Sequence, residues 1–179
     1  MRTLQLAILG FCLLASDTMA QQPIQTAPQW KYVKDDDPLH GTVHDRFILE
    51  GVYLTPPRLT TKTPAIVIEC SNGKVEQNYF SVGAVVVDKP GMRRRVMTLD
   101  GRIDGKQTAF LRDGLSTDGQ DVFFPRYDLT RILKGKEVIV GAYEYLGVQV
   151  VMRFEIPDSS PVMGKCGSDR ILKHYMKVK

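Results

Sequence analysis

The chain has 179 residues, of which 24 are lysine or arginine and 20 are aspartate or glutamate, so its formal net charge is +4 at pH 7. This length suits one ordinary domain, and the positive excess is too small and too dispersed to imply nucleic-acid binding. The sequence carries no glycine-rich phosphate loop and no dinucleotide-binding motif, so no cofactor is expected.

The first 20 residues have the features of a secretory signal peptide. Arg2 supplies a positive start, and residues 6–15 form an apolar run that is too short to cross a bilayer. Small or tolerated residues at positions 18–20 supply a cleavage site, so we predict a cut after Ala20. The mature protein is then expected in the periplasm or outside the cell, with no transmembrane segment.

Three cysteines occur in the chain. Cys12 lies in the predicted leader, and a lipoprotein would carry its lipid there, but Phe11 precedes it where a small residue is expected. The mature chain keeps Cys70 and Cys166, and an exported protein is expected to join such a pair as a disulfide. That bond would stabilise the fold by about 4 to 5 kcal/mol. The alternative is two buried free thiols.

After the leader, residues 21–29 contain two prolines and no hydrophobic period, so they predict a flexible lead. Order is expected to begin near Trp30. The acidic segment Asp35–Asp45 follows, and we interpret it as a solvated turn that leads into the first long strand.

From there to residue 156 the dominant pattern is alternation of β-branched and aromatic residues with period two. Asn72-Gly73 and Leu146-Gly147 each stand between two such runs and predict antiparallel hairpins. The expected strands, about eight in number, are residues 47–54, 65–70, 80–86, 93–99, 107–112, 122–124, 137–145 and 148–156.

One short helix interrupts the strands. Leu129, Ile132 and Leu133 share a helical face, Asp128 is placed to cap the start, and Gly135 is placed to end it. The predicted fold class is therefore mainly β, an antiparallel β-sandwich or barrel with one short helix. We expect a single domain over residues 30–167 and a basic tail over 168–179.

The Asp35–Asp45 segment could also bind zinc or calcium, since it combines carboxylates with two imidazoles, His40 and His44. Its spacing matches no closed metal motif. In a turn or strand, His40 and His44 would lie too far apart to hold one ion. The solvated turn is therefore favoured, and no metal ligand is predicted.

A serine-hydrolase interpretation would use Ser116 as the nucleophile. A nucleophile elbow needs Gly-x-Ser-x-Gly between a strand and a helix, and here Asp118 occupies the place of the second glycine. A turn with side-chain to backbone hydrogen bonds is favoured. We predict no catalytic residue.

Two basic groups could contact an anion such as phosphate, an acidic glycan or a membrane surface. Arg93 and Arg95 would share one side of a strand, with Arg94 on the other, and Lys173–Lys179 forms the basic tail. Solvated charges that discourage aggregation at a sheet edge are the favoured interpretation, with anion binding at Arg93 and Arg95 as the alternative.

A series of short landmarks spans residues 30–167. In this order they resemble the type VI secretion-associated accessory family called VasI, which consists of small exported proteins. The resemblance implies an accessory role without catalytic residues, although Glu69 stands where the family usually has an arginine. The landmarks are Trp30-Lys31-Tyr32-Val33, Asp37-Pro38-Leu39, residues 64–70, Asp104-Gly105-Lys106, Ser116-Thr117-Asp118, residues 129–133, residues 145–154 and Cys166-Gly167.

Together these observations predict a non-enzymatic exported binding or accessory module that acts through protein–protein interaction in the cell envelope. Such a domain would present loops or an edge strand to its partner. The alternatives are a small metal-dependent or serine hydrolase and an anion, cell-wall or membrane-surface binder.

Overall fold

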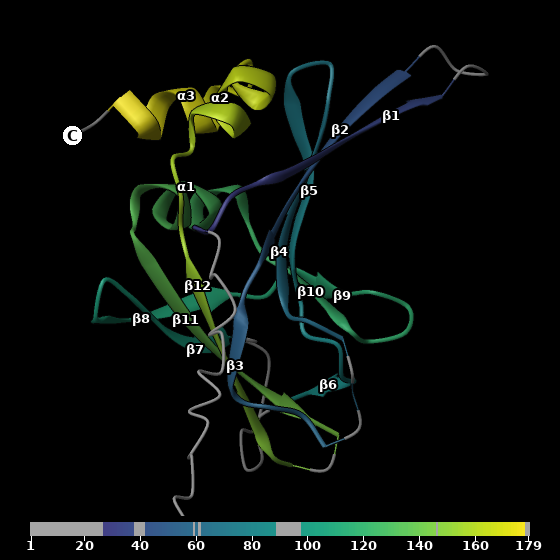
Figure 1. The fold of residues 1–179 in the computed structure, drawn as a ribbon, viewed down its shortest axis with the longest axis vertical. Helices are drawn as coiled ribbons and strands as arrows, with labels where there is room; N and C mark the ends of the chain where they lie inside the picture. The colour runs from purple at the N-terminus through teal and green to yellow at the C-terminus, as the bar shows by residue number, and fades with distance from the viewer. Residues whose placement is uncertain are drawn as a thin grey trace, which may run out of the picture.

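The computed structural model describes residues 27–37, 42–58, 60, 62–88, 98–145 and 147–177. The predicted leader, its cut after Ala20, and the arginines Arg93 and Arg95 lie outside these residues. The described chain forms two antiparallel sheets with three short helices gathered toward one end (Figure 1).

The first sheet has the strand order β1-β2-β4-β5-β10-β9, so β1 and β9 are its edges. Its central hairpin, β4 to β5, turns at Asn72 and Gly73, which have φ angles of 51° and 76°. Two consecutive positive φ values are what the predicted Asn-Gly hairpin requires. The strands are β1 (Lys31–Asp37), β2 (Thr42–Glu50), β4 (Ala65–Ser71), β5 (Lys74–Ser81), β9 (Gly114–Leu115) and β10 (Asp121–Phe123).

The second sheet has the order β3-β12-β11-β7-β8, and β6 pairs with the far end of β11. The hairpin from β11 to β12 confirms the prediction made from the alternation in residues 148–156, since Val150, Met152 and Phe154 are fully buried. The strands are β3 (Val52–Thr55), β6 (Val86–Val87), β7 (Thr98–Ile103), β8 (Lys106–Leu111), β11 (Glu137–Glu144) and β12 (Gln149–Glu155).

The two sheets face each other across a core of aromatic rings. The ring of Phe80 from the first sheet lies 5.6 Å from that of Phe110 and 6.0 Å from that of Phe154, both in the second sheet. The ring of Phe124 stacks at 4.4 Å from Phe80. The sequence predicted either a sandwich or a barrel, and the structure is a sandwich.

Some predicted strand bounds are wrong. The expected strand at 47–54 is divided at Gly51, where the chain passes from β2 in one sheet to β3 in the other. A side chain there would lie 2.5 Å from the carbonyl oxygen of Arg153 and from the ring of Phe154, so only glycine fits. The expected strand at 80–86 is replaced by β5 and the short β6, because β5 begins directly after the hairpin turn.

Helix α1 (Arg126–Lys134) is the predicted helix, and it ends at Gly135 as expected, whose amide donates to the carbonyl of Ile132 at 3.0 Å. The predicted cap is wrong, because Pro125 occupies the N-cap and Asp128 lies inside the first turn. The sequence prediction also lacks α2 (Ser160–Cys166) and α3 (Arg170–Lys177). Part of the predicted basic tail is therefore helical, and its Leu172 is fully buried.

The predicted disulfide joins the helical end to the first sheet. The sulfur atoms of Cys70 and Cys166 lie at bonding distance, with their Cα atoms 5.7 Å apart. The amide of Ser168 also donates to the carbonyl of Gly73 at 3.0 Å. Among the described residues, no helix is long and apolar enough to cross a membrane.

Candidate interaction site at the β1 edge

Strand β1 pairs with β2 along its whole length, from Lys31 opposite Ile48 to Asp37 opposite Thr42. The predicted acidic turn over Asp35–Asp45 is therefore wrong for Asp35, Asp36 and Asp37 in β1 and for residues 42–45 in β2, which lie within this ladder. Aspartate is a poor strand former, but the fixed pairing with β2 outweighs its intrinsic preference. Residues 38–41, including His40, lie outside the described residues.

The edge of β1 that points away from β2, its outer side, is open. Its sheet ends there (Figure 1), and in the described parts of the chain no hydrogen bond from another element reaches that side. Residues 31–36 are all exposed. Half of the backbone N–H and C=O groups of an edge strand point away from its neighbour, so β1 presents a row of donors and acceptors to solvent.

The inner face of β1 is fixed by a tyrosine. The hydroxyl of Tyr32 donates to the carboxylate of Asp45 at 2.5 Å, and its ring lies 5.3 Å from that of Phe47. Asp45 is only 7% exposed, so this bond satisfies a buried acceptor. The hydrogen bond to Asp45, with desolvation as the next cause, raises the pKa of Tyr32.

Helix α2 lies beside this face. The ammonium group of Lys165 stands 5.5 Å from the centre of the Tyr32 ring, which is a cation–π distance. The next residue, Cys166, is bonded to Cys70 in β4. The disulfide thereby fixes α2 to β4, from where Lys165 reaches Tyr32 of β1.

A side-chain network also holds α3. The carboxylate of Asp169 accepts the amides of Ile171 and Leu172 at 2.9 and 3.3 Å, which caps the helix. It also pairs with Arg126 of α1 at 3.1 Å. Asp169 is 2% exposed, so this interaction links two helices inside the structure.

The edge of the second sheet at β8 is covered along its second half. Asp128 of α1 accepts the amide of Leu111 at 2.8 Å, and Arg131 donates to the carbonyl of Ala109 at 3.3 Å and to the hydroxyl of Thr108. Asp128 and Arg131 also pair with each other at 2.7 Å. These side chains occupy backbone groups that another strand would need.

The remaining edges are short. Strands β6 and β9 have two residues each and β3 has four, against seven in β1. Short edge strands offer few hydrogen bonds to an added strand. Among the edges in the described chain, β1 is thus the one with both length and free backbone groups.

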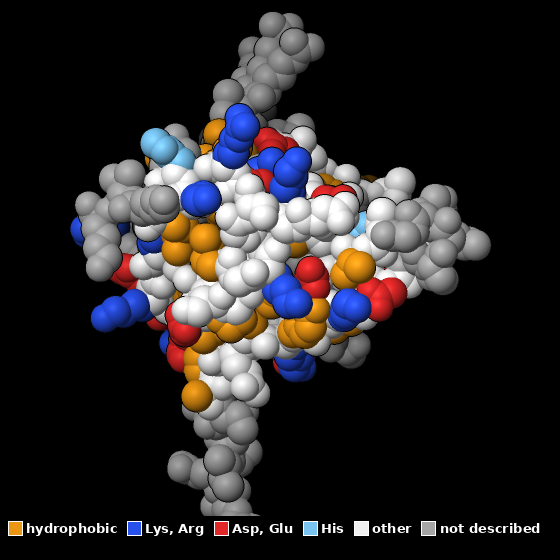
Figure 2. All heavy atoms as spheres, turned by 90° about the horizontal axis from the view of Figure 1, so that it is seen from above, with side chains coloured by type: hydrophobic (Ala, Val, Ile, Leu, Met, Phe, Trp, Pro, Cys, Tyr) orange, Lys and Arg blue, Asp and Glu red, His pale blue; other side chains and the backbone are white. Residues whose placement is uncertain are grey.

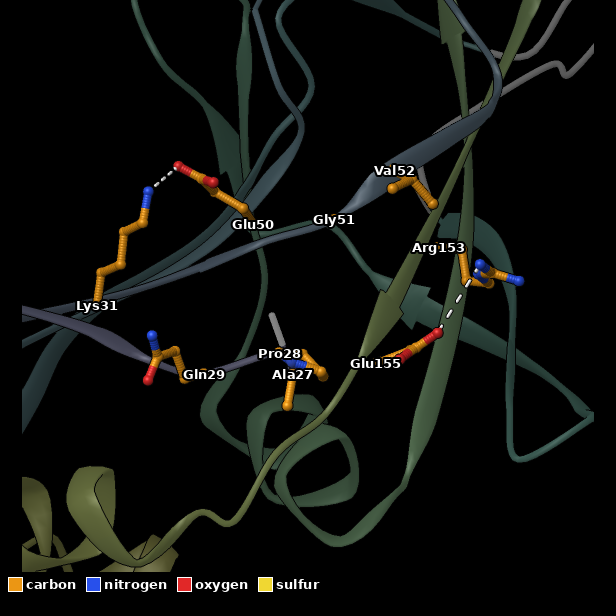
Figure 3. Close-up of a pocket in the computed structure, with 9 residues that line it drawn as sticks. All are labelled: Ala27, Pro28, Gln29, Lys31, Glu50, Gly51, Val52, Arg153 and Glu155. Carbon is orange, nitrogen blue, oxygen red and sulfur yellow. Dashed lines mark hydrogen bonds and ion pairs between the residues drawn. The ribbon is translucent and has the colours of Figure 1, made fainter. Parts of the chain in front are cut away.

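Two hollows are lined by described residues. The first has a volume of about 470 Å³ and lies where the chain crosses at Gly51, beside Lys31 at the start of β1 (Figure 3). Its charged side chains are already paired, Lys31 with Glu50 and, at 3.8 Å, Arg153 with Glu155. The second, of about 550 Å³, lies on the outer face of the second sheet around Gly141. Neither gathers groups that suggest a reaction.

His44 and Ser116, which were considered for metal and hydrolase chemistry, have structural partners. One ring nitrogen of His44 lies 3.3 Å from Glu76 and the other lies 3.2 Å from the hydroxyl of Thr42. Within the described ranges, no group of three or more potential metal ligands is found.

Ser116 forms the turn that the sequence predicts. Its hydroxyl donates to Asp118 at 2.6 Å and accepts the amide of Asp121 at 2.9 Å. The amide of Gln120 donates to the same oxygen of Asp118 at 3.1 Å. The hydrogen bond from Ser116 is the largest cause that lowers the pKa of the Asp118 carboxyl. Ser116 therefore stabilises a turn, and its hydroxyl both donates and accepts a hydrogen bond within that turn.

Arg93 and Arg95, the residues of the anion-binding alternative, lie outside the described residues. Arg170 and Lys173 of the predicted basic tail lie in α3, at the helical end. Figure 2, which views the molecule from above this end, shows lysine and arginine side chains scattered among acidic and hydrophobic ones. No single-sign surface is visible among the described residues on that face.

Comparison with protein-family models, with curated proteins and with solved structures finds no match. The resemblance to the VasI family stays a prediction from sequence. The geometry of the β1 edge therefore carries the functional argument.

The sequence could have revealed β1. Trp30, Tyr32 and Val33 are aromatic or β-branched residues, which favour a strand. The three consecutive aspartates hid this signal, because they are typical of turns. That β1 is an edge follows from the strand order, which this local signal does not contain.

Proposed function

We propose that this protein is an exported, non-enzymatic accessory module that binds another polypeptide by adding one of its strands to β1. The single observation that supports this is the open edge of β1, seven residues long and exposed from residue 31 to residue 36. The other long edge, β8, is covered by side chains of α1.

Strand addition suits this edge physically. The backbone groups of β1 supply the hydrogen bonds, and alternate side chains select the partner. Tyr32, bonded to Asp45 and lying under Lys165, holds the strand straight before a partner arrives. A preformed strand loses little conformational entropy on binding, so more of the interaction energy appears as affinity.

The predicted signal peptide and the resemblance to VasI support a place in the cell envelope, beside a secretion system. A disulfide between Cys70 and Cys166 is the kind of bond that persists in an oxidising compartment such as the periplasm. The partner would then be an envelope protein with an extended segment.

Site-specific photocrosslinking in the native envelope tests the proposal. A photoreactive residue at Val33, whose side chain is 44% exposed, is expected to form a covalent adduct with the bound polypeptide. The matched control is the same residue at Leu111, which is 46% exposed but lies on the covered β8 edge. Equal crosslinking at both positions, or none at Val33, would contradict the proposal.

A further inference from the structure

We propose that the strand added to β1 is the β1 strand of a second copy, paired antiparallel about Val33, so that one sheet runs through both copies. This inference rests on the proposed function, because it uses the same open edge. A partner strand of different sequence would have to displace the second copy, so self-pairing would regulate access to the edge.

The charges on one face of β1 are ordered so that two copies of the strand complement each other. Lys31, Val33 and Asp35 share that face, because alternate residues of a strand point the same way. Antiparallel pairing about Val33 sets Lys31 of each copy opposite Asp35 of the other, and sets the two Val33 side chains together. Lys31 now pairs with Glu50 in an exposed ion pair, which is weak enough to be exchanged for Asp35. The strand is thus complementary to itself, and the two-fold symmetry makes each charge pair occur twice.

The inner face agrees with the same register. It sets the ring of Tyr32 opposite Lys34 of the second copy, an aromatic–cation pair. It also sets Asp36 opposite Trp30, so no two like charges meet. The native exposed pair between Lys34 and Asp36, at 2.8 Å, is weak enough to rearrange.

Neighbouring symmetric registers are worse. Pairing about Lys34 sets the two Lys34 side chains against each other, and pairing about Asp35 does the same with two carboxylates. Pairing about Tyr32 sets Lys31 opposite Val33 and loses the charge pairs. Like charges directly opposite each other destabilise a sheet, so the sequence of β1 selects the register about Val33.

The charges also explain why the open edge need not aggregate. Charged side chains discourage indiscriminate pairing at sheet edges. Here their order leaves one favourable arrangement, and the symmetry closes it at two copies. An interface of a single strand pair is small, so the association is expected to be weak and reversible.

Charge reversal tests this arrangement in the exported chain. Lys31→Asp sets two aspartates opposite each other, and Asp35→Lys sets two lysines opposite each other. Each variant is expected to weaken self-association by about thirtyfold, because both symmetric pairs become repulsive. The association is measured by sedimentation equilibrium over a concentration series.

Mixing the two variants provides the decisive measurement. The Lys31→Asp variant carries a carboxylate at both paired positions of its outer face, and the Asp35→Lys variant carries an ammonium group at both. Opposite charges therefore meet at both contacts of the mixed pair, and heterodimers are expected to form with about the wild-type affinity. Energy transfer between differently labelled variants detects them. Folding is checked by circular dichroism, so a variant that unfolds is recognised and replaced by the milder Lys31→Gln or Asp35→Asn.

The matched control is Asp36→Lys, which makes the same charge change on the opposite face of β1. Because its partner position is Trp30, self-association is expected to stay within about threefold of wild type. A loss equal to that of Asp35→Lys would overturn the register about Val33.

The outcomes separate this inference from the proposed function. A protein that stays monomeric at every concentration, or variants that do not recover on mixing, would overturn self-pairing. If Val33 still crosslinks to a different protein, the proposed function stands without it. If self-pairing occurs and Val33 crosslinks only to a second copy, the inference stands and the envelope partner is rejected.

Discussion

Strands β1 and β8 stand at edges of different sheets, yet the chain treats them in opposite ways. At β8, a buried carboxylate and a guanidinium of α1 bond to Leu111 and Ala109, in the positions that an added strand would use. At β1, the hydrogen bond from Tyr32 to Asp45 lies on the inner face, and the outer side stays open.

Of the two long edge strands, only β8 has its outward backbone groups bonded by side chains of a helix. Asp128 is 1% exposed, and burying a carboxylate for this purpose is energetically expensive. The open β1 edge therefore supports the proposed binding role. The following predictions test how far each edge depends on its own contacts.

The largest effect is expected from removing the disulfide. Cys70→Ser with Cys166→Ser opens a loop of sequence separation 96 and is expected to lower the free energy of unfolding by about 4 kcal/mol. Denaturant unfolding measures this loss. Amide exchange should increase more in β1 than in β8, because α2 is released while α1 stays. Reductant should have no further effect on the double variant, and an unchanged midpoint would contradict the prediction.

The next effect concerns the covered edge. Asp128→Ala leaves the amide of Leu111 without its acceptor and Arg131 without its partner. We expect a loss of about 3 kcal/mol in unfolding free energy, with faster exchange of the Leu111 amide. Asp113→Asn, at an aspartate two residues beyond Leu111, is the control and should change little. Equal losses for both variants would mean that Asp128 does not cover the edge.

A smaller effect is expected at the inner face of β1. Tyr32→Phe removes the bond to Asp45 and keeps the ring, so the amides of β1 should exchange about fivefold faster while those of β8 stay unchanged. Because the folded pKa of Tyr32 is raised, this bond contributes fully below the unfolded pKa and is lost as pH rises through the folded pKa.

Alkaline titration checks that sign. In the wild type, β1 exchange should gain an additional increase above about pH 10, where an ordinary tyrosine ionises. Tyr32→Phe should lack this step. A step that persists in the variant would assign it to another group, such as Tyr79, whose pKa burial raises to about 12.

The smallest effect is expected from Lys165→Ala. The cation–π contact with Tyr32 is exposed, so its loss should lower the unfolding free energy by only about 0.5 kcal/mol. Lys165→Arg should retain the contact. A loss as large as that of the disulfide would show that α2 is held chiefly by this lysine.

Much of the fold could be predicted because its main hairpins carry local signals. The alternation that ends in Val150, Met152 and Phe154 fixes which face of β12 is buried, and Asn72-Gly73 fixes a turn. These features depend on neighbouring residues alone. The disulfide is the one long-range contact that could be predicted, because two cysteines of an exported protein are expected to pair with each other.

What could not be predicted depends on distant contacts. Helix α2 is only seven residues long and contains Gly164, which disfavours helix, and it is held by the bond from Cys166. The capping role of Asp169 appears only when Arg126 is brought beside it. Likewise, whether β1 lies at an edge is a property of strand order, which the local sequence does not contain. Its three aspartates, which are typical of turns, also kept β1 from being predicted as a strand.

The covalent link between β4 and α2 also has a mechanical consequence. Tension applied between the two sides of the molecule would pass from Cys70 to Cys166 through sulfur, and the chain between them, of sequence separation 96, would bear no load. Pulling on a strand bound at β1 could peel β1 and β2 but would stop at β4. Reduction would then release about 330 Å of additional contour length, converting a stiff tether into an extensible one.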